Sequence, residues 1–136
     1  MPSITICTAV YEAGRPFLAD WIAGVIDAAV DHNVDVVVAV DDLADPEESL
    51  ATLREAVGLT IVEAPPSSTP AQVRGTMLTA ATAGSSDVLV FCDMDDKLLS
   101  SAFDEHLAAL ECADFSYGDL LLSGSDGVPD GRKFLD

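Results

Sequence analysis

The stretch Val88-Leu89-Val90-Phe91-Cys92-Asp93-Met94-Asp95-Asp96 joins an apolar run directly to a cluster of carboxylates. An unbroken apolar run that ends on polar residues is typical of a strand buried in a parallel sheet. The run from Val34 to Val40 has the same form and ends on Asp41-Asp42. The alternating, β-branched segment from Ser3 to Val10 predicts another strand. We therefore expect three strands of one parallel sheet, each followed by polar residues at its carboxyl end.

Helical patterns separate these strands. Apolar residues recur at intervals of three and four from Phe17 to about Asp31, which predicts an amphipathic helix with Pro16 in its first turn. Further expected elements are helices over 46–57, 71–83 and 98–110 and strands over 59–62 and 115–122. Strands that alternate with helices predict one α/β domain over residues 1–136, with a Rossmann-like, mainly parallel sheet and helices on both faces.

The composition is strongly acidic. Asp and Glu number 24 against 6 Lys and Arg, which gives a formal net charge of −18. Such self-repulsion destabilises a compact chain in dilute buffer and is screened at high salt, so we expect a halophilic source; an ordinary acidic protein is the alternative. The sequence has no basic patch that could replace phosphate counterions, and this argues against nucleic acid and anionic lipid as partners.

Cysteine usage and hydropathy indicate the compartment. Cys7, Cys92 and Cys112 form an odd set without a C-x-x-C pair, which suits free thiols in a reducing cytoplasm. The sequence starts without the basic and apolar segments of a secretory signal, and no run approaches the roughly 20 apolar residues of a membrane span. We expect a soluble, cytoplasmic protein.

The acidic cluster after the 88–92 run is the first candidate site. Asp93, Asp95 and Asp96 repel one another unless a cation lies between them. Mg²⁺ and Mn²⁺ prefer a few carboxylate oxygens together with phosphates and water, so the pattern predicts a metal–diphosphate site. The alternative is a solvated acidic loop or the start of a helix, because Asp is a good helix cap.

Three further candidates lie at the expected strand ends and, for Arg74, inside the helix expected over 71–83. The carboxylates of Asp41-Asp42 could accept the ring N–H of a uracil or thymine or the hydroxyls of a ribose, or could merely cap the next helix. Tyr11 could stack on a base or cover the sheet edge. Arg74 could meet a diphosphate, hold the acidic cluster in place, or form an ordinary surface ion pair.

The order of these motifs resembles the nucleotide-binding half of the family-2 glycosyltransferases, which have the GT-A fold. The similarity covers about residues 3 to 122. The matching pieces are residues 4–11, residues 36–42 with Asp45, Arg74-Gly75, the 88–96 stretch with its D-x-D-D motif, and Phe115-Ser116-Tyr117-Gly118-Asp119.

The resemblance implies a nucleotide-diphosphate sugar as the ligand and Mg²⁺ or Mn²⁺ as the cofactor. The implied nucleotide-binding residues are Thr8, Tyr11, Asp41, Asp42, Arg74 and Asp93. The implied metal-binding residues are Asp93, Asp95 and Asp96.

The chain also departs from the family pattern. Glu12 replaces an Asn, Ala44 a Ser and Gly75 an Asn. Only 40 residues follow Asp96. They include Asp119, Asp126 and Asp130 but not the usual acceptor-binding elements, so we expect a truncated GT-A fold with no identifiable catalytic base. A homodimer or a partner protein could supply the acceptor site.

Two other functional classes stay open. A binding or regulatory module of the same fold would bind the nucleotide sugar without turnover. A phosphatase of the haloacid dehalogenase type also has D-x-D after an apolar strand, but on its first strand and with further catalytic residues on later ones. A dinucleotide-binding dehydrogenase is disfavoured because no G-x-G-x-x-G follows the first strand.

Overall fold

The computed structural model describes residues 1–118, 121–124, 126 and 128–133. The chain divides into two compact units, Met1–Ser100 and Ser101–Asp136, and each is described by itself. The single domain expected over residues 1–136 stays a prediction. Within the described residues, no helix combines the length and the apolar character needed to cross a bilayer.

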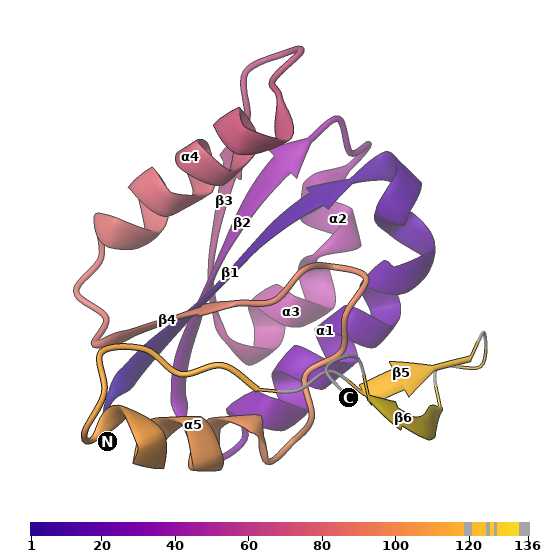
Figure 1. Ribbon diagram of the computed structural model, residues 1–136. Helices are drawn as coiled ribbons and strands as arrows, with labels where there is room; N and C mark the ends of the chain where they lie inside the picture. Colours follow the sequence, from indigo (N-terminus) through magenta and orange to yellow (C-terminus); the bar gives the residue numbers. More distant parts are fainter. Residues whose placement is uncertain (119–120, 125, 127, 134–136) are drawn as a thin grey trace. The chain divides into compact units, whose positions relative to one another are not determined.

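A four-stranded sheet forms the centre of the first unit. Its strands are β1 (Ser3–Tyr11), β2 (Asn33–Asp41), β3 (Gly58–Glu63) and β4 (Val88–Phe91). They lie in the order β3-β2-β1-β4, and every neighbouring pair is parallel (Figure 1). The expected α/β fold with a parallel sheet is confirmed, and β4 is one of its edge strands.

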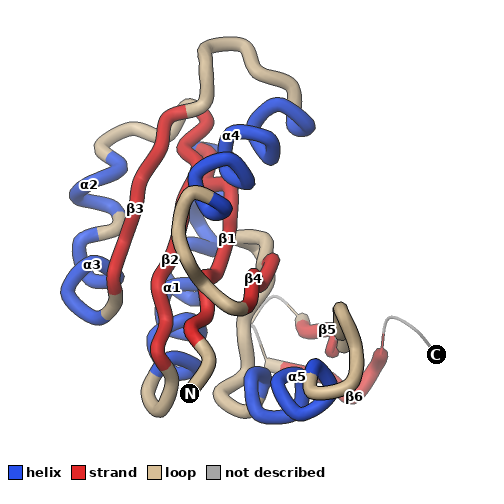
Figure 2. The backbone as a smooth tube through the Cα atoms, turned by 90° about the vertical axis from the view of Figure 1, so that its left-hand side faces the viewer, coloured by secondary structure: helices blue, strands red, loops and turns tan. Residues whose placement is uncertain are grey.

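Helices cover both faces of this sheet, as the sequence predicted. They are α1 (Arg15–Ala29), preceded by a 3₁₀ turn over Glu12–Gly14, α2 (Pro46–Ser49), α3 (Ala51–Ala56) and α4 (Pro70–Thr82). Figures 1 and 2 show α4 on one face and the α2–α3 pair on the opposite face. The helix expected over 46–57 is interrupted at Leu50, whose backbone is not helical and whose side chain is fully buried.

Alternation along the strands builds the two halves of the core, because successive side chains point to opposite faces of a sheet. One half packs β1 and β2 against α4 through Cys7, Val37, Ala39, Val73, Met77 and Ala81. On the other face of the same strands, buried residues include Ile4, Ile6, Val36 and Val38. Strands buried on both faces explain why these segments are almost wholly apolar in the sequence.

The second unit holds α5 (Ala102–Leu110) and an antiparallel pair of short strands, β5 (Leu121–Ser123) and β6 (Pro129–Lys133). The strand expected over 115–122 is wrong for residues 115–118, which are neither helix nor strand. Phe115 and Tyr117 are 75% and 79% exposed, so no packing partner holds them in a pleated sheet. Asp119 lies outside the described residues.

Candidate metal and nucleotide site

The carboxyl edge of the sheet is stepped. Tyr11 at the end of β1 is opposite Asp41 at the end of β2. The shorter strand β4 ends earlier, with Phe91 opposite Cys7, and the Cys92 amide still donates to the Cys7 carbonyl at 3.3 Å. The loop after β4 therefore leaves the sheet beside the middle of β1, below the edge where β1 and β2 end.

The loop after β4 gathers three carboxylates. Oxygen atoms of Asp93, Asp95 and Asp96 all lie within 4.8 Å of one another, and the three side chains are exposed. The Asp96 amide donates to the Asp93 carbonyl at 3.0 Å, which closes a tight turn. Met94, between the first two acids, is only 1% exposed. The alternation of acid, Met and acid thus places the carboxylates outward and an apolar anchor inward.

Close packing against α1 positions this loop. The indole N–H of Trp21 donates to the Cys92 carbonyl at 3.3 Å. A Cβ atom at Gly14 would overlap the Met94 sulfur, and a Cβ at Gly24 would lie 2.9 Å from the Leu98 carbonyl oxygen. Glycine at Gly14, in the 3₁₀ turn before α1, leaves room for the Met94 side chain. Glycine at Gly24 lets the backbone of α1 approach the backbone of the loop at Leu98.

The electrostatics of the cluster favour a cation. The pKa of Asp96 is raised, first by partial loss of contact with water and then by the charges of Asp95 and Asp93. Arg74 on α4 is 3.8 Å from Asp93, and both side chains are largely exposed. One guanidinium leaves most of the negative charge uncompensated. This cluster of oxygen atoms could hold a metal ion, and carboxylate oxygens are ligands that Mg²⁺ and Mn²⁺ accept.

A cleft of about 330 Å³ borders the cluster. Its polar side is formed by Arg74, Asp93 and Asp96, so the structure brings these three predicted residues together. The exposed ring of Phe91 and the side chain of Leu78 supply apolar lining. The remaining lining residues are Cys7 and Met77. A cleft with a charged side and an apolar wall suits a ligand that carries both polar and apolar groups.

The two buried thiols near the cleft, Cys7 and Cys92, are expected to be unreactive. Burial raises the pKa of both Cys7 and Cys92 to about 11. A thiol with so high a pKa is almost entirely protonated at neutral pH and is therefore a poor nucleophile. We assign these cysteines to the core.

The predicted nucleoside contacts lie at the upper part of the stepped edge. Tyr11 is exposed, Asp41 is half-buried, and Asp42 is exposed with a left-handed backbone at φ 54°. Thr8 differs, because it lies within β1 and is only 1% exposed, with its hydroxyl 3.4 Å from the Ala9 carbonyl. The structure thus places Tyr11, Asp41 and Asp42 at the edge, and Thr8 in the core.

Sequence reasoning missed two residues that support this edge. The sequence marks Glu12 only as a departure from the family pattern and gives no role to Arg15. The two side chains form an ion pair at 2.6 Å next to the loop that follows β2. The available signal was an acid three residues before an arginine at the start of a helix.

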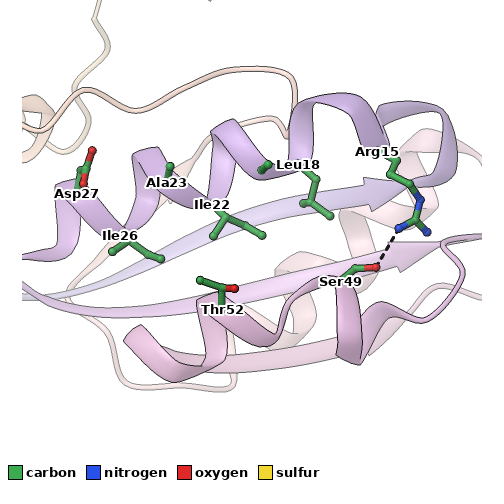
Figure 3. A pocket seen from close by; sticks show the side chains of 9 residues that line it. Arg15, Leu18, Ile22, Ala23, Ile26, Asp27, Ser49 and Thr52 are labelled. Carbon is green, nitrogen blue, oxygen red and sulfur yellow. Dashed lines mark hydrogen bonds between the residues drawn. The ribbon is translucent and has the colours of Figure 1, made fainter.

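A larger hollow lies elsewhere and has different chemistry. It measures about 560 Å³ and separates α1 from α2 and α3 (Figure 3). Its lining is mainly apolar, with Arg15 at one end donating to Ser49 and Asp27 toward the other. Among the described residues no cluster of acids lines it, so size alone does not make it the candidate site.

The chain matches no protein-family model and no curated protein. Its fold resembles solved glycosyltransferase structures. TarS 1–349 from S. aureus is 16% identical over 79% of this chain, with a TM-score of 0.64. The same protein in complex with UDP is 15% identical over 79%, with a TM-score of 0.65. The mannosyltransferase PcManGT from Pyrobaculum calidifontis, in complex with GDP-Man and Mn²⁺, is 18% identical over 75%, with a TM-score of 0.58.

The matched part is short relative to these proteins. This chain spans 31% of the length of the two TarS chains and 30% of PcManGT. Identities of 15% to 18% are evidence about architecture and not about substrate. The chain therefore has an α/β fold shared with glycosyltransferases, over about a third of their length.

Proposed function

We propose that the unit Met1–Ser100 binds a nucleotide-diphosphate sugar together with Mg²⁺ or Mn²⁺. The observation that carries this proposal is the convergence of Asp93, Asp95 and Asp96 within 4.8 Å, at the carboxyl end of a sheet strand. Ligands of open α/β sheets bind beyond the carboxyl ends of the strands. The glycosyltransferase fold supports the same ligand class, because one solved structure with this fold contains UDP and another contains GDP-Man with Mn²⁺.

In this proposal the carboxylates of Asp93, Asp95 and Asp96 hold the metal. When bound, a divalent cation stabilises negative charge on a diphosphate and on a departing nucleoside diphosphate. Arg74 faces the same cleft and supplies the other positive charge next to Asp93. Tyr11, Asp41 and Asp42 form the nucleoside end, with the ring of Tyr11 stacking on the base and the carboxylates accepting hydrogen bonds.

Transfer of the sugar to an acceptor is the reaction that this arrangement serves, and it requires a base for the acceptor hydroxyl. Asp130 is unsuited to that role, because its pairing with Arg132 at 2.6 Å lowers its pKa. Asp126 accepts a hydrogen bond from the Val128 amide. The assignment of a base stays open, and a second copy or another protein that supplies an acceptor surface stays a prediction.

A binding module without turnover is the second candidate, because none of the described residues is assigned as the base. A phosphatase of the haloacid dehalogenase type is less compatible with the topology. Its D-x-D motif follows the first strand, whereas here the motif follows β4 at the sheet edge. Turnover of a nucleotide sugar, measured after binding is established, separates the transferase from the binding module.

The test is calorimetric titration of UDP, GDP and dTDP into the protein at molar KCl, with and without Mn²⁺. Asp93→Asn/Asp95→Asn removes two ligands, and Asp20→Asn/Asp31→Asn is the matched control because it makes the same charge change at exposed positions. We expect Mn²⁺-dependent binding that only the first variant loses. Absence of binding by a folded wild-type sample, or equal loss in both variants, would contradict the proposal.

A further inference from the structure

An ion pair at the start of α1 is unusually complete for an exposed one. Arg15 Nε is 2.6 Å from one oxygen of Glu12, and Arg15 Nη2 is 2.8 Å from the other. The side chain of Arg15 is 39% exposed and that of Glu12 is 53% exposed. An exposed pair of this kind contributes little to folding stability by itself. Its role must be sought in what else the two side chains contact.

Both partners bind the same residue of the loop that follows β2. The Ala44 amide donates to Glu12 Oε2 at 3.3 Å, and Arg15 Nη2 donates to the Ala44 carbonyl at 2.9 Å. Arg15 Nη1 donates in addition to the Ser49 hydroxyl at 3.0 Å. The pair therefore holds the donor and the acceptor of one residue, and also the helix that the loop enters.

The loop needs such support. Asp42 and Asp45, on either side of Ala44, have φ values of 54° and 47°. Left-handed backbone is unfavourable for residues other than glycine, although Asp tolerates it better than most. The side chain of Leu43 is buried and anchors the loop from below. The hydrogen bonds from Glu12 and Arg15 fix it from the solvent side.

Charge strengthens the case for Arg15. The loop carries Asp41, Asp42 and Asp45. The pKa of Arg15 is raised chiefly by its hydrogen bonds to Glu12, and the charge of Asp45 adds a smaller contribution. Without the guanidinium, Glu12 would add a fourth carboxylate beside them. The pKa of Glu12 is lowered, chiefly by its bonds to Arg15 and then by the Ala44 amide, so the pair persists under mildly acidic conditions.

We propose that Glu12 and Arg15 are positioning residues that hold the loop after β2 in the conformation that presents Asp41 and Asp42 to the nucleoside. This inference rests on the proposed function. It predicts a class of effect that a simple surface ion pair would not have: loss of the pair lowers nucleotide affinity while the fold keeps its stability.

The first test compares Arg15→Lys with Arg54→Lys. Lysine keeps the charge, but its three N–H donors diverge from one nitrogen. They cannot reproduce the four hydrogen bonds that Arg15 donates from Nε, Nη1 and Nη2 to Glu12, Ser49 and Ala44. Arg54 is the matched control, because it pairs with Glu47 at 2.8 Å and also donates to a carbonyl, that of Leu59. We expect Arg15→Lys to weaken Mn²⁺-dependent nucleotide diphosphate binding about tenfold and Arg54→Lys to leave it within about twofold, with similar melting temperatures.

The second test exchanges the pair, as Glu12→Arg/Arg15→Glu. The exchange keeps an ion pair but places a guanidinium against the Ala44 amide and a carboxylate against its carbonyl. We expect the exchanged variant, like Arg15→Lys, to bind nucleotide diphosphate more weakly than the wild-type chain. Recovery of wild-type affinity, or unchanged affinity in Arg15→Lys, would overturn the inference and leave an ordinary surface ion pair.

Hydrogen–deuterium exchange without ligand separates this inference from the proposed function. We expect the Ala44 amide to exchange at least tenfold faster in Arg15→Lys than in the wild-type chain, and at an unchanged rate in Arg54→Lys. If the wild-type chain binds no nucleotide, the proposed function fails and the nucleoside role of the pair fails with it. The exchange rates then still show whether the pair holds the loop, and unchanged rates overturn that too.

Discussion

Two acidic loops at the carboxyl edge of the sheet are held in different ways. The loop after β4 is anchored from inside, by Met94 packed against Gly14. Its three clustered carboxylates accept no side-chain hydrogen bond from the described residues, and only Asp93 has an ion pair. The loop after β2 is fixed from outside, through hydrogen bonds between its backbone and a charged pair.

The two loops differ in what neutralises their polar groups. The β4 loop has negative charge that a bound cation could neutralise, whereas the backbone of the β2 loop is held by hydrogen bonds within the protein. In the first, the protein supplies shape and leaves negative charge for a cation to neutralise. In the second, the protein supplies the polar partners itself. Loss of the inner anchor of the β4 loop should therefore lower stability, whereas loss of the polar partners of the β2 loop should lower ligand affinity more than stability.

The largest expected effect on stability comes from the substitution of Met94. Met94→Ala should lower the free energy of unfolding by about 2–4 kcal/mol, because a fully buried side chain is lost and a cavity remains. Chemical denaturation measures it. Leu99→Ala, at a half-exposed position in the same segment, should cost less than about 1 kcal/mol. Equal losses in the two variants would show that the inner anchor is not what holds this loop.

Gly14→Ala should have the next largest effect. The new methyl group would displace the Met94 side chain, at a cost of about 1–3 kcal/mol. Gly75→Ala is the matched control, since no atom lies within 4 Å of a Cβ there. That change in the interior of α4 should stabilise the chain by about 0.5–1 kcal/mol. Opposite signs are expected, and in a Met94→Ala background the cost of Gly14→Ala should shrink.

Asp95→Asn should have a smaller and less usual effect. It removes repulsion within the acidic cluster, so the metal-free chain should become more stable by less than about 1 kcal/mol, while Mn²⁺ binding weakens. Thermal unfolding at low and at molar salt measures this, and screening should shrink the gain at molar salt. A loss of stability would mean that the carboxylate has a structural partner and does not await a cation.

The smallest effect distinguishes the loops by their response to acid. In the metal-free chain the pKa of Asp96 is raised and that of Glu12 is lowered. The charged form of Asp96 destabilises the fold. The free energy of unfolding therefore rises as the pH falls through the folded pKa of Asp96, and this gain is complete below its unfolded pKa. The contribution of Glu12 is complete above its unfolded pKa and is lost as the pH falls through its folded pKa. Carboxyl chemical shifts followed by NMR should show Asp96 titrating above, and Glu12 below, the ordinary range for its type. Titration of the two groups in the reverse order would contradict the difference between the loops.

Much of this fold could be predicted from the sequence, because buried parallel strands leave long apolar runs. The runs that became β2 and β4 also placed Asp41-Asp42 and Asp93 at strand ends, where the structure has them. The strand expected over 115–122 is absent at residues 115–118, although this segment also has a β-prone sequence. A β-prone segment becomes a strand only when a partner pairs with it, and the sequence does not name the partner.

Other features depended on geometry that sequence patterns do not encode. The early end of β4 follows from its register with β1, and the burial of Thr8 from the length of β1 beyond it. The contact of Glu12 with Ala44 joins residues 32 positions apart, in a loop where Asp42 has a left-handed backbone. In the sequence, Glu12 and Ala44 were two separate departures from a family pattern; in the structure, they contact each other.

The most direct test of the central claim is paramagnetic broadening of backbone amide NMR signals by Mn²⁺, with and without UDP or GDP. In a chain with 24 acidic residues, weak binding of Mn²⁺ at many surface positions is the competing explanation. The account predicts that nucleotide concentrates the broadening at Asp93–Asp96 and the facing turn of α4 around Arg74. Broadening spread over the acidic surface and unchanged by nucleotide would contradict it.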